Sequence, residues 1–204
     1  MNKRKYNTII FDFGGVIINI DYELTRKAFK TLDINNREVN FSQNEQSDLF
    51  DKFEKGQISP KMFRQGIKKH LNIDISDREI DMAWNKMLLD IPPERIDWIL
   101  KLKEKYQCVL LSNTNAIHYD AFREEFEANY GYEKFSDLFH KTYFSHEIAL
   151  RKPDANIYNY VLNDLNLKPS EVLFLDDTEK NINAAQKLGW NCILWKNKEL
   201  DELF

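Results

Sequence analysis

Four short apolar runs do most to constrain how this chain of 204 residues can fold. They are Thr8 to Phe11, Cys108 to Leu111, Val172 to Leu175 and Cys192 to Trp195. Their residues are apolar without alternation, which is typical of strands covered on both faces, and such strands occur in parallel sheets. We therefore predict a parallel sheet with helices on each face.

Helical patterns alternate with these strands in the second half of the chain. The apolar spacing predicts helices from about Ala116 to Asn129, Asp154 to Leu165 and Glu179 to Leu188. Gly189 follows the last of them, at the position where glycine commonly ends a helix. Because strands and helices alternate, we predict an α/β protein with a Rossmann-like, doubly wound parallel sheet.

Between about residues 18 and 90 the strand-like runs disappear and helical spacing replaces them. Ser59 is followed directly by proline, and Ser76 is followed three residues later by glutamate, and both patterns are typical of helix starts. We predict that residues 18–90 form an all-helical cap domain, inserted into an α/β core built from residues 1–17 and 91–204.

The composition argues against two classes of partner. Acidic residues number 33 and basic residues 29, so the net charge of −4 provides no positive field for nucleic acid. The apolar runs are far shorter than the roughly 20 residues that cross a bilayer, and the basic N-terminus is not followed by a signal-peptide pattern. Cys108 and Cys192 lie in apolar runs, as buried reduced thiols do. We expect a cytoplasmic protein that binds neither nucleic acid nor membranes; the sequence indicates no oligomeric state.

Polar side chains follow three predicted strands, at the edge where open parallel sheets bind ligands. They are Asp12 after the first strand, Ser112 and Asn113 at the end of the second, and Asp176 and Asp177 at the end of the Val172 strand. Lys152 follows a weaker strand-like run, Thr142 to Phe144. The fold thus predicts that a lone carboxylate, a hydroxyl, an ammonium and a carboxylate pair share one edge.

This combination suits phosphoryl transfer. A carboxylate can attack phosphorus and become an acyl phosphate, while an ammonium and a hydroxyl hold the phosphoryl oxygens. Paired carboxylates without nearby His or Cys favour a hard divalent cation, usually Mg²⁺. Taken singly, Asp176 and Asp177 fit helix capping equally well and Lys152 fits an exposed lysine, so the prediction depends on the combination.

Four segments carry a resemblance to a known family. They are Asp12-Phe13-Gly14-Gly15-Val16, Ser112-Asn113-Thr114-Asn115, Arg151-Lys152-Pro153 and Asp176-Asp177-Thr178-Glu179-Lys180-Asn181. In order and spacing they resemble the four motifs of the haloacid dehalogenase superfamily, most closely the branch containing bacterial α-D-glucose-1-phosphate phosphatase. The resemblance covers nearly the whole chain, because the helical insert falls where the superfamily's cap falls.

The resemblance implies a role for each site residue. Asp12 would be the nucleophile and a Mg²⁺ ligand, joined by the Gly14 backbone carbonyl, by Asp177 directly and by Asp176 directly or through water, with Asn181 in support. Ser112 would bind the transferring phosphoryl group, Lys152 would pair with that group and with Asp12, and Asn113 would help bind substrate. His118 lies near the Ser112 motif, so we also consider a contact between its ring and the substrate.

Gly14 departs from the usual pattern of the superfamily. Phosphatases of the superfamily usually carry a second Asp there, which protonates the leaving group and then activates water. A glycine keeps the backbone carbonyl but has no acid to offer. We therefore expect either a substrate whose leaving oxygen is weakly basic, such as a sugar 1-phosphate or an acyl phosphate, or a proton supplied by Asp21 or Glu23.

The function that the sequence favours is a Mg²⁺-dependent phosphatase acting on a small phosphorylated metabolite, such as a hexose 1-phosphate, through an aspartyl-phosphate at Asp12. A 2-haloacid dehalogenase would use the same nucleophile without metal, and the Asp176-Asp177 pair argues against it. A phosphorylation-controlled receiver domain would place its acidic pair at the first strand instead. A catalytically weak binding or regulatory relative stays open because of Gly14.

Overall fold

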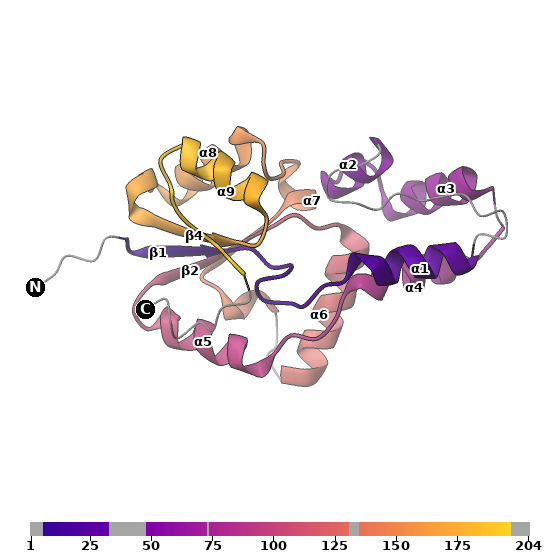
Figure 1. Ribbon diagram of the computed structural model, residues 1–204, viewed down its shortest axis with the longest axis horizontal. Helices are drawn as coiled ribbons and strands as arrows, with labels where there is room; N and C mark the ends of the chain where they lie inside the picture. The colour runs from indigo at the N-terminus through magenta and orange to yellow at the C-terminus, as the bar shows by residue number, and fades with distance from the viewer. Residues whose placement is uncertain (1–5, 33–47, 73, 131–134, 197–204) are drawn as a thin grey trace, which may run out of the picture.

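The computed structural model describes residues 6–32, 48–72, 74–130 and 135–196. Its strands form one parallel sheet in the order β3-β2-β1-β4-β5 (Figure 1). The strands are β1 (Thr8–Phe11), β2 (Gln107–Ser112), β3 (Lys141–Phe144), β4 (Val172–Asp176) and β5 (Asn191–Leu194). All four predicted strands are present, and the weaker run forms the edge strand β3. The predicted doubly wound α/β sheet is therefore confirmed.

Helices cover both faces of this sheet (Figure 1). They are α5 (Pro93–Lys103), α6 (Ala116–Tyr130), α7 (Ser145–Ile148), α8 (Ala155–Leu165) and α9 (Glu179–Lys187), with 3₁₀ turns η2 (Phe135–Leu138) and η3 (Pro169–Glu171). Because side chains alternate along a strand, Ile9 and Phe11 enter the apolar cluster that α5 and α6 cover. Ile10 enters the opposite cluster, beneath α8 and α9. Every residue of β1 is buried, as its unbroken apolar run predicts.

The described residues between β1 and α5 form helices set beyond the carboxyl end of β1 (Figure 1). They are α1 (Tyr22–Leu32), α2 (Asp48–Glu54), α3 (Pro60–Leu71), α4 (Asp77–Trp84) and the 3₁₀ turn η1 (Asn85–Met87). Ser59 caps α3, and Ser76 with Glu79 forms a complete capping box at α4, as predicted. Helices α1 to α4 share an apolar cluster that includes Phe63 and Trp84, and Ile117 of α6 belongs to the same cluster.

The chain enters and leaves this helical segment along two neighbouring connections. Ile20 and Leu88 form an antiparallel bridge. Asn19 N–H donates to the Asp90 carbonyl at 2.9 Å, and Leu89 N–H donates to the Asn19 carbonyl at 2.9 Å. The two connections are thus hydrogen-bonded to each other near the predicted limits of the insert.

Within the described ranges, no helix combines the length and the apolarity needed to cross a membrane. Cys108 is buried and Cys192 half-buried, and both are free thiols, as expected. Burial raises the pKa of each thiol to about 12, so neither is a reactive thiolate at neutral pH.

Candidate active site

Three carboxylates meet where β1 and β4 end. Phe11 pairs with Leu175 across these strands, so Asp12 and Asp176, one residue further along each strand, lie side by side. The Asp12 N–H donates to the Leu175 carbonyl at 2.8 Å, which extends the pairing to the site. Asp12, Asp176 and Asp177 each offer a carboxylate oxygen, and these oxygens all lie within 4.8 Å of one another.

Lys152 reaches this cluster from the loop between α7 and α8. Its Nζ lies 2.7 Å from Asp12 Oδ1 and 2.7 Å from Asp176 Oδ2, and its side chain is 1% exposed. Burial alone would lower the pKa of Lys152, but the two carboxylates outweigh it and raise that pKa above its usual value. Lys152 is therefore a charged ammonium, and the alternative of an exposed surface lysine is excluded.

The four groups together carry a net negative charge. Burial raises the pKa of Asp12 well above its usual value, and although Lys152 lowers it, Asp176 and Asp177 raise it further. Burial, followed by the charge of Asp176, also raises the pKa of Asp177. One ammonium does not balance three carboxylates, so the oxygen cluster has the charge and the ligand type that suit a divalent cation.

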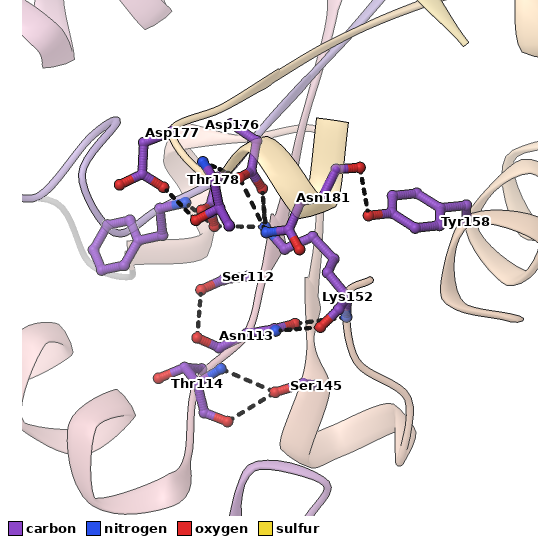
Figure 2. A network of polar contacts seen from close by, with 12 residues as sticks. Ser112, Asn113, Thr114, Ser145, Lys152, Tyr158, Asp176, Asp177, Thr178 and Asn181 are labelled. Atoms are coloured by element: carbon purple, nitrogen blue, oxygen red, sulfur yellow. Dashed lines mark hydrogen bonds and ion pairs between the residues drawn. The ribbon is translucent and has the colours of Figure 1, made fainter. Parts of the chain in front are cut away.

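Asp176 is held by donors from several elements (Figure 2). Its carboxylate accepts from Asn181 Nδ2 at 3.0 Å on both oxygens and from the Thr178 N–H at 2.8 Å, in addition to Lys152. Asn181 lies on the first turn of α9, where its carbonyl accepts the Tyr158 hydroxyl at 3.0 Å. Asn181 thus orients the Asp176 carboxylate.

Two glycines shape the loop after Asp12. Gly15 has φ +72°, and a Cβ on it would lie 2.2 Å from Asp177 Oδ2, so only glycine leaves Asp177 in place. Gly14 has ordinary backbone geometry, and a Cβ there would lie 3.2 Å from Ile20 Cδ1. A hydrocarbon side chain therefore borders the position where the superfamily pattern has its acid.

The residues that follow Ser112 are hydrogen-bonded to Lys152 and to Ser145 (Figure 2). The Asn113 amide binds the Lys152 backbone twice, since Lys152 N–H donates to Oδ1 at 2.9 Å and Nδ2 donates to the Lys152 carbonyl at 2.8 Å. The Thr114 N–H donates to Ser145 Oγ at 2.9 Å, and that hydroxyl donates back to the Thr114 carbonyl at 2.8 Å. Sequence reasoning missed Ser145, because no motif marks it.

The Ser112 hydroxyl makes only a long contact within the protein. Its hydroxyl lies 3.5 Å from the Asn113 carbonyl, which is long for a hydrogen bond between oxygens. Asn113 was expected to bind substrate, whereas in the structure both ends of its amide hold the Lys152 backbone. The loop therefore presents the Ser112 hydroxyl, while the Asn113 side chain joins the loop to Lys152.

The structure also gives the contacts of His118, Glu23 and Asp21. His118 is 7% exposed. Its Nδ1 lies 3.1 Å from Asn115 Nδ2 and its Nε2 lies 3.1 Å from the Trp84 carbonyl, so both ring nitrogens have partners inside the protein. Glu23 pairs with Arg26, whose hydrogen bonds hold the pKa of that carboxylate below its usual value. Asp21 accepts the Glu23 N–H at 2.9 Å.

Comparison with known proteins identifies the family. A family model described as haloacid dehalogenase-like hydrolase matches residues 6–189. D-ribitol-5-phosphate phosphatase of Bacteroides thetaiotaomicron is 31% identical over 183 residues, which cover 89% of this chain and 88% of that protein. A sesquiterpene phosphatase of Aspergillus oryzae is 26% identical over 188 residues, covering 90% and 87%.

A solved structure gives a similar result. The wild-type haloacid dehalogenase family enzyme of Bacteroides thetaiotaomicron, in complex with magnesium and inorganic phosphate, superposes with a TM-score of 0.85 at 38% identity. The match covers 98% of this chain and 99% of that chain. With the four motifs, the parallel sheet and the carboxylate cluster in place, the chain belongs to the haloacid dehalogenase-like hydrolase family.

Proposed function

We propose that this chain is a Mg²⁺-dependent phosphatase that acts on a small phosphorylated metabolite, a sugar phosphate or sugar alcohol phosphate. The observation that carries the proposal is the cluster of three carboxylates within 4.8 Å of one another, with the Lys152 ammonium between two of them. Such a cluster suits a site that receives both a metal ion and an anionic group. The naming of two relatives as phosphatases supports the same activity.

The residues present fit a Mg²⁺ ion. Asp12, Asp177 and the Gly14 carbonyl would hold it as oxygen ligands, and Asp176 would do so directly or through water. Bound there, Mg²⁺ supplies the positive charge that neutralises the phosphoryl oxygens. Burial, and after it the neighbouring carboxylates, raises the pKa of Asp12 and of Asp177, and a bound cation would favour the charged form of both. The complex of the Bacteroides thetaiotaomicron enzyme with magnesium and phosphate gives further support.

In this proposal Asp12 is the nucleophile. Its Oδ1 accepts the Phe13 N–H at 2.7 Å and pairs with Lys152, which fixes the orientation of the carboxylate. An Asp12 oxygen forms a bond to phosphorus as the bond from phosphorus to the substrate oxygen breaks. Lys152 and the Ser112 hydroxyl would bind the transferring oxygens. Water then attacks phosphorus, releases inorganic phosphate and restores the Asp12 carboxylate.

The leaving oxygen of the substrate must receive a proton, and the lack of an obvious donor limits which substrates the site can hydrolyse. Gly14 has no side chain to donate one, Ile20 borders its position, and the Arg26 pair keeps Glu23 ionised. A leaving oxygen of low basicity asks least of an acid, which favours a sugar 1-phosphate or an acyl phosphate. The relative named for D-ribitol 5-phosphate favours a phosphorylated sugar alcohol. Both kinds of substrate therefore belong in the test.

The test is phosphate release from sugar 1-phosphates, sugar 6-phosphates, ribitol 5-phosphate and acetyl phosphate, with Mg²⁺ and with EDTA. We expect activity with Mg²⁺, none with EDTA, and a loss of at least about a thousandfold in Asp12→Asn. Asp97→Asn makes the same chemical change at an exposed position and should keep wild-type activity. Phosphate release that survives EDTA or Asp12→Asn would reject the proposal, and metal-independent release of halide from a 2-haloacid would favour the dehalogenase alternative.

A further inference from the structure

A buried set of hydrogen bonds joins the end of α4 to the start of α6. The Trp84 indole Nε1–H donates to Asn115 Oδ1 at 3.3 Å, and the same oxygen accepts the His118 N–H at 3.1 Å. The Trp84 ring stacks on the His118 imidazole, with centroids 4.7 Å apart and planes 16° from parallel. Asn115 therefore acts as the N-terminal cap of α6 and as an acceptor for the inserted helices at once.

These contacts fix the tautomer of His118. Because Asn115 Oδ1 accepts two hydrogen bonds, its Nδ2 faces His118 Nδ1 as a donor, and Nδ1 must be the acceptor. The ring proton then lies on Nε2, which donates to the Trp84 carbonyl at 3.1 Å. That carbonyl also accepts the Thr25 hydroxyl at 2.9 Å, and Thr25 Oγ1 accepts the Met87 N–H at 3.0 Å. The network is buried and mutually consistent from α1 to α6.

We propose that Asn115 and His118 are positioning residues, which lock the inserted helices to the phosphoryl-binding loop in a single arrangement. Asn115 ends the segment that begins with Ser112, so displacing Trp84 would disturb the residues next to the phosphoryl site. Ile20, on the connection into α1, borders Gly14 in that site. A fully satisfied buried network specifies one geometry, because any displacement leaves several donors and acceptors unpaired. This inference rests on the proposed phosphatase function.

Under the proposed function the core binds the phosphoryl group, and in this proposal helices α1 to α4 meet the rest of the substrate. Removing the hydrogen bonds of His118 should therefore slow the hydrolysis of a substrate with a large leaving group and leave that of a small one nearly unchanged. His118→Phe keeps the aromatic ring against Trp84 and removes both hydrogen bonds of the imidazole. Glu124→Gln, at an exposed position of the same helix, is the matched control.

The experiment compares kcat and KM for acetyl phosphate with those for the best sugar phosphate or sugar alcohol phosphate of the wild-type protein. We expect His118→Phe to lower kcat/KM for the large substrate by about tenfold or more, mainly through KM, and to leave acetyl phosphate within about threefold. Equal losses for both substrates, or no loss for either, would overturn the inference. Glu124→Gln should match wild type with both.

A second measurement, which does not depend on enzyme activity, tests the proposal if His118→Phe does not fold. Nitrogen-15 NMR of the wild-type protein should show His118 with a bare Nδ1 and a protonated Nε2. Asn115→Asp keeps the Oδ1 acceptor but replaces the donor, so Nδ1 should become protonated in that variant. A wild-type ring protonated on Nδ1 would overturn the inference. A wild-type protein that hydrolyses neither substrate would instead reject the phosphatase proposal. The NMR result would still test the hydrogen bonds by which Asn115 and His118 hold Trp84.

Discussion

Lowering the pH should reduce the free energy of unfolding because His118 is buried as a neutral ring. Burial lowers the pKa of His118 from its usual 6.5 to about 4, although its hydrogen bond to Trp84 works in the opposite direction. The folded state thus favours the neutral ring, so this contribution to stability is complete above pH 6.5 and is lost as the pH falls through 4. At about 1.4 kcal/mol per pH unit, the whole interval is worth about 3 kcal/mol, and about 2 kcal/mol of it is lost between pH 7.5 and pH 5.

The assay is urea unfolding of the wild-type protein and of His118→Phe, both in EDTA, at pH 7.5 and at pH 5. At pH 7.5 the variant should be the less stable protein, because Asn115 Nδ2 and the Trp84 carbonyl lose a partner. At pH 5 the difference in unfolding free energy between the two proteins should be smaller by about 2 kcal/mol.

Other titrating groups do not disturb this comparison. The raised pKa values of Asp12 and Asp177 make the folded state bind protons more readily, so these groups stabilise it as the pH falls. The lowered pKa of His146, caused by burial, acts in the opposite direction. Both proteins share these contributions, which cancel in the difference. A difference that stays the same at the two pH values would refute a buried neutral His118.

Two further substitutions test the loops around the carboxylates. Gly15→Ala should abolish measurable Mg²⁺ binding in calorimetric titration, because its Cβ would lie 2.2 Å from Asp177 Oδ2 at a residue with φ +72°; binding at wild-type affinity would contradict this. Asn113→Ala should lower kcat by about tenfold to a hundredfold with an unchanged circular dichroism spectrum, because the Lys152 backbone loses two hydrogen bonds. A wild-type kcat would show that Lys152 needs no such support.

The strands were predictable because their signal is local. A strand buried on both faces needs an unbroken apolar run, and β1, β2 and β4 have one. The last strand runs from Asn191 to Leu194, one residue earlier than predicted, and it is a half-buried edge strand rather than one covered on both faces. Trp195 looked like its final residue, but it is buried in the cluster beneath α5 instead.

The partners of individual polar side chains were not predictable in the same way. Lys152 lies between Asp12 and Asp176, and only the contact with Asp12 was expected from the sequence. The Asn113 amide hydrogen-bonds to the Lys152 backbone, and His118 hydrogen-bonds to the Trp84 backbone. Both partners are far away in the sequence. Nothing in the local pattern distinguishes an amide that holds a loop from one that binds substrate.

Ile117 of α6 belongs to the apolar cluster of helices α1 to α4, and this affects how the protein can change by recombination. The two connections at Ile20 and Leu88 lie side by side, so removing the segment between them would leave ends that a short turn can join. Yet Ile117 of α6 packs among the side chains of helices α1 to α4, and Asn115 and His118 bond to Trp84. Replacing the segment between Ile20 and Leu88 by a foreign one would therefore need matching changes on α6.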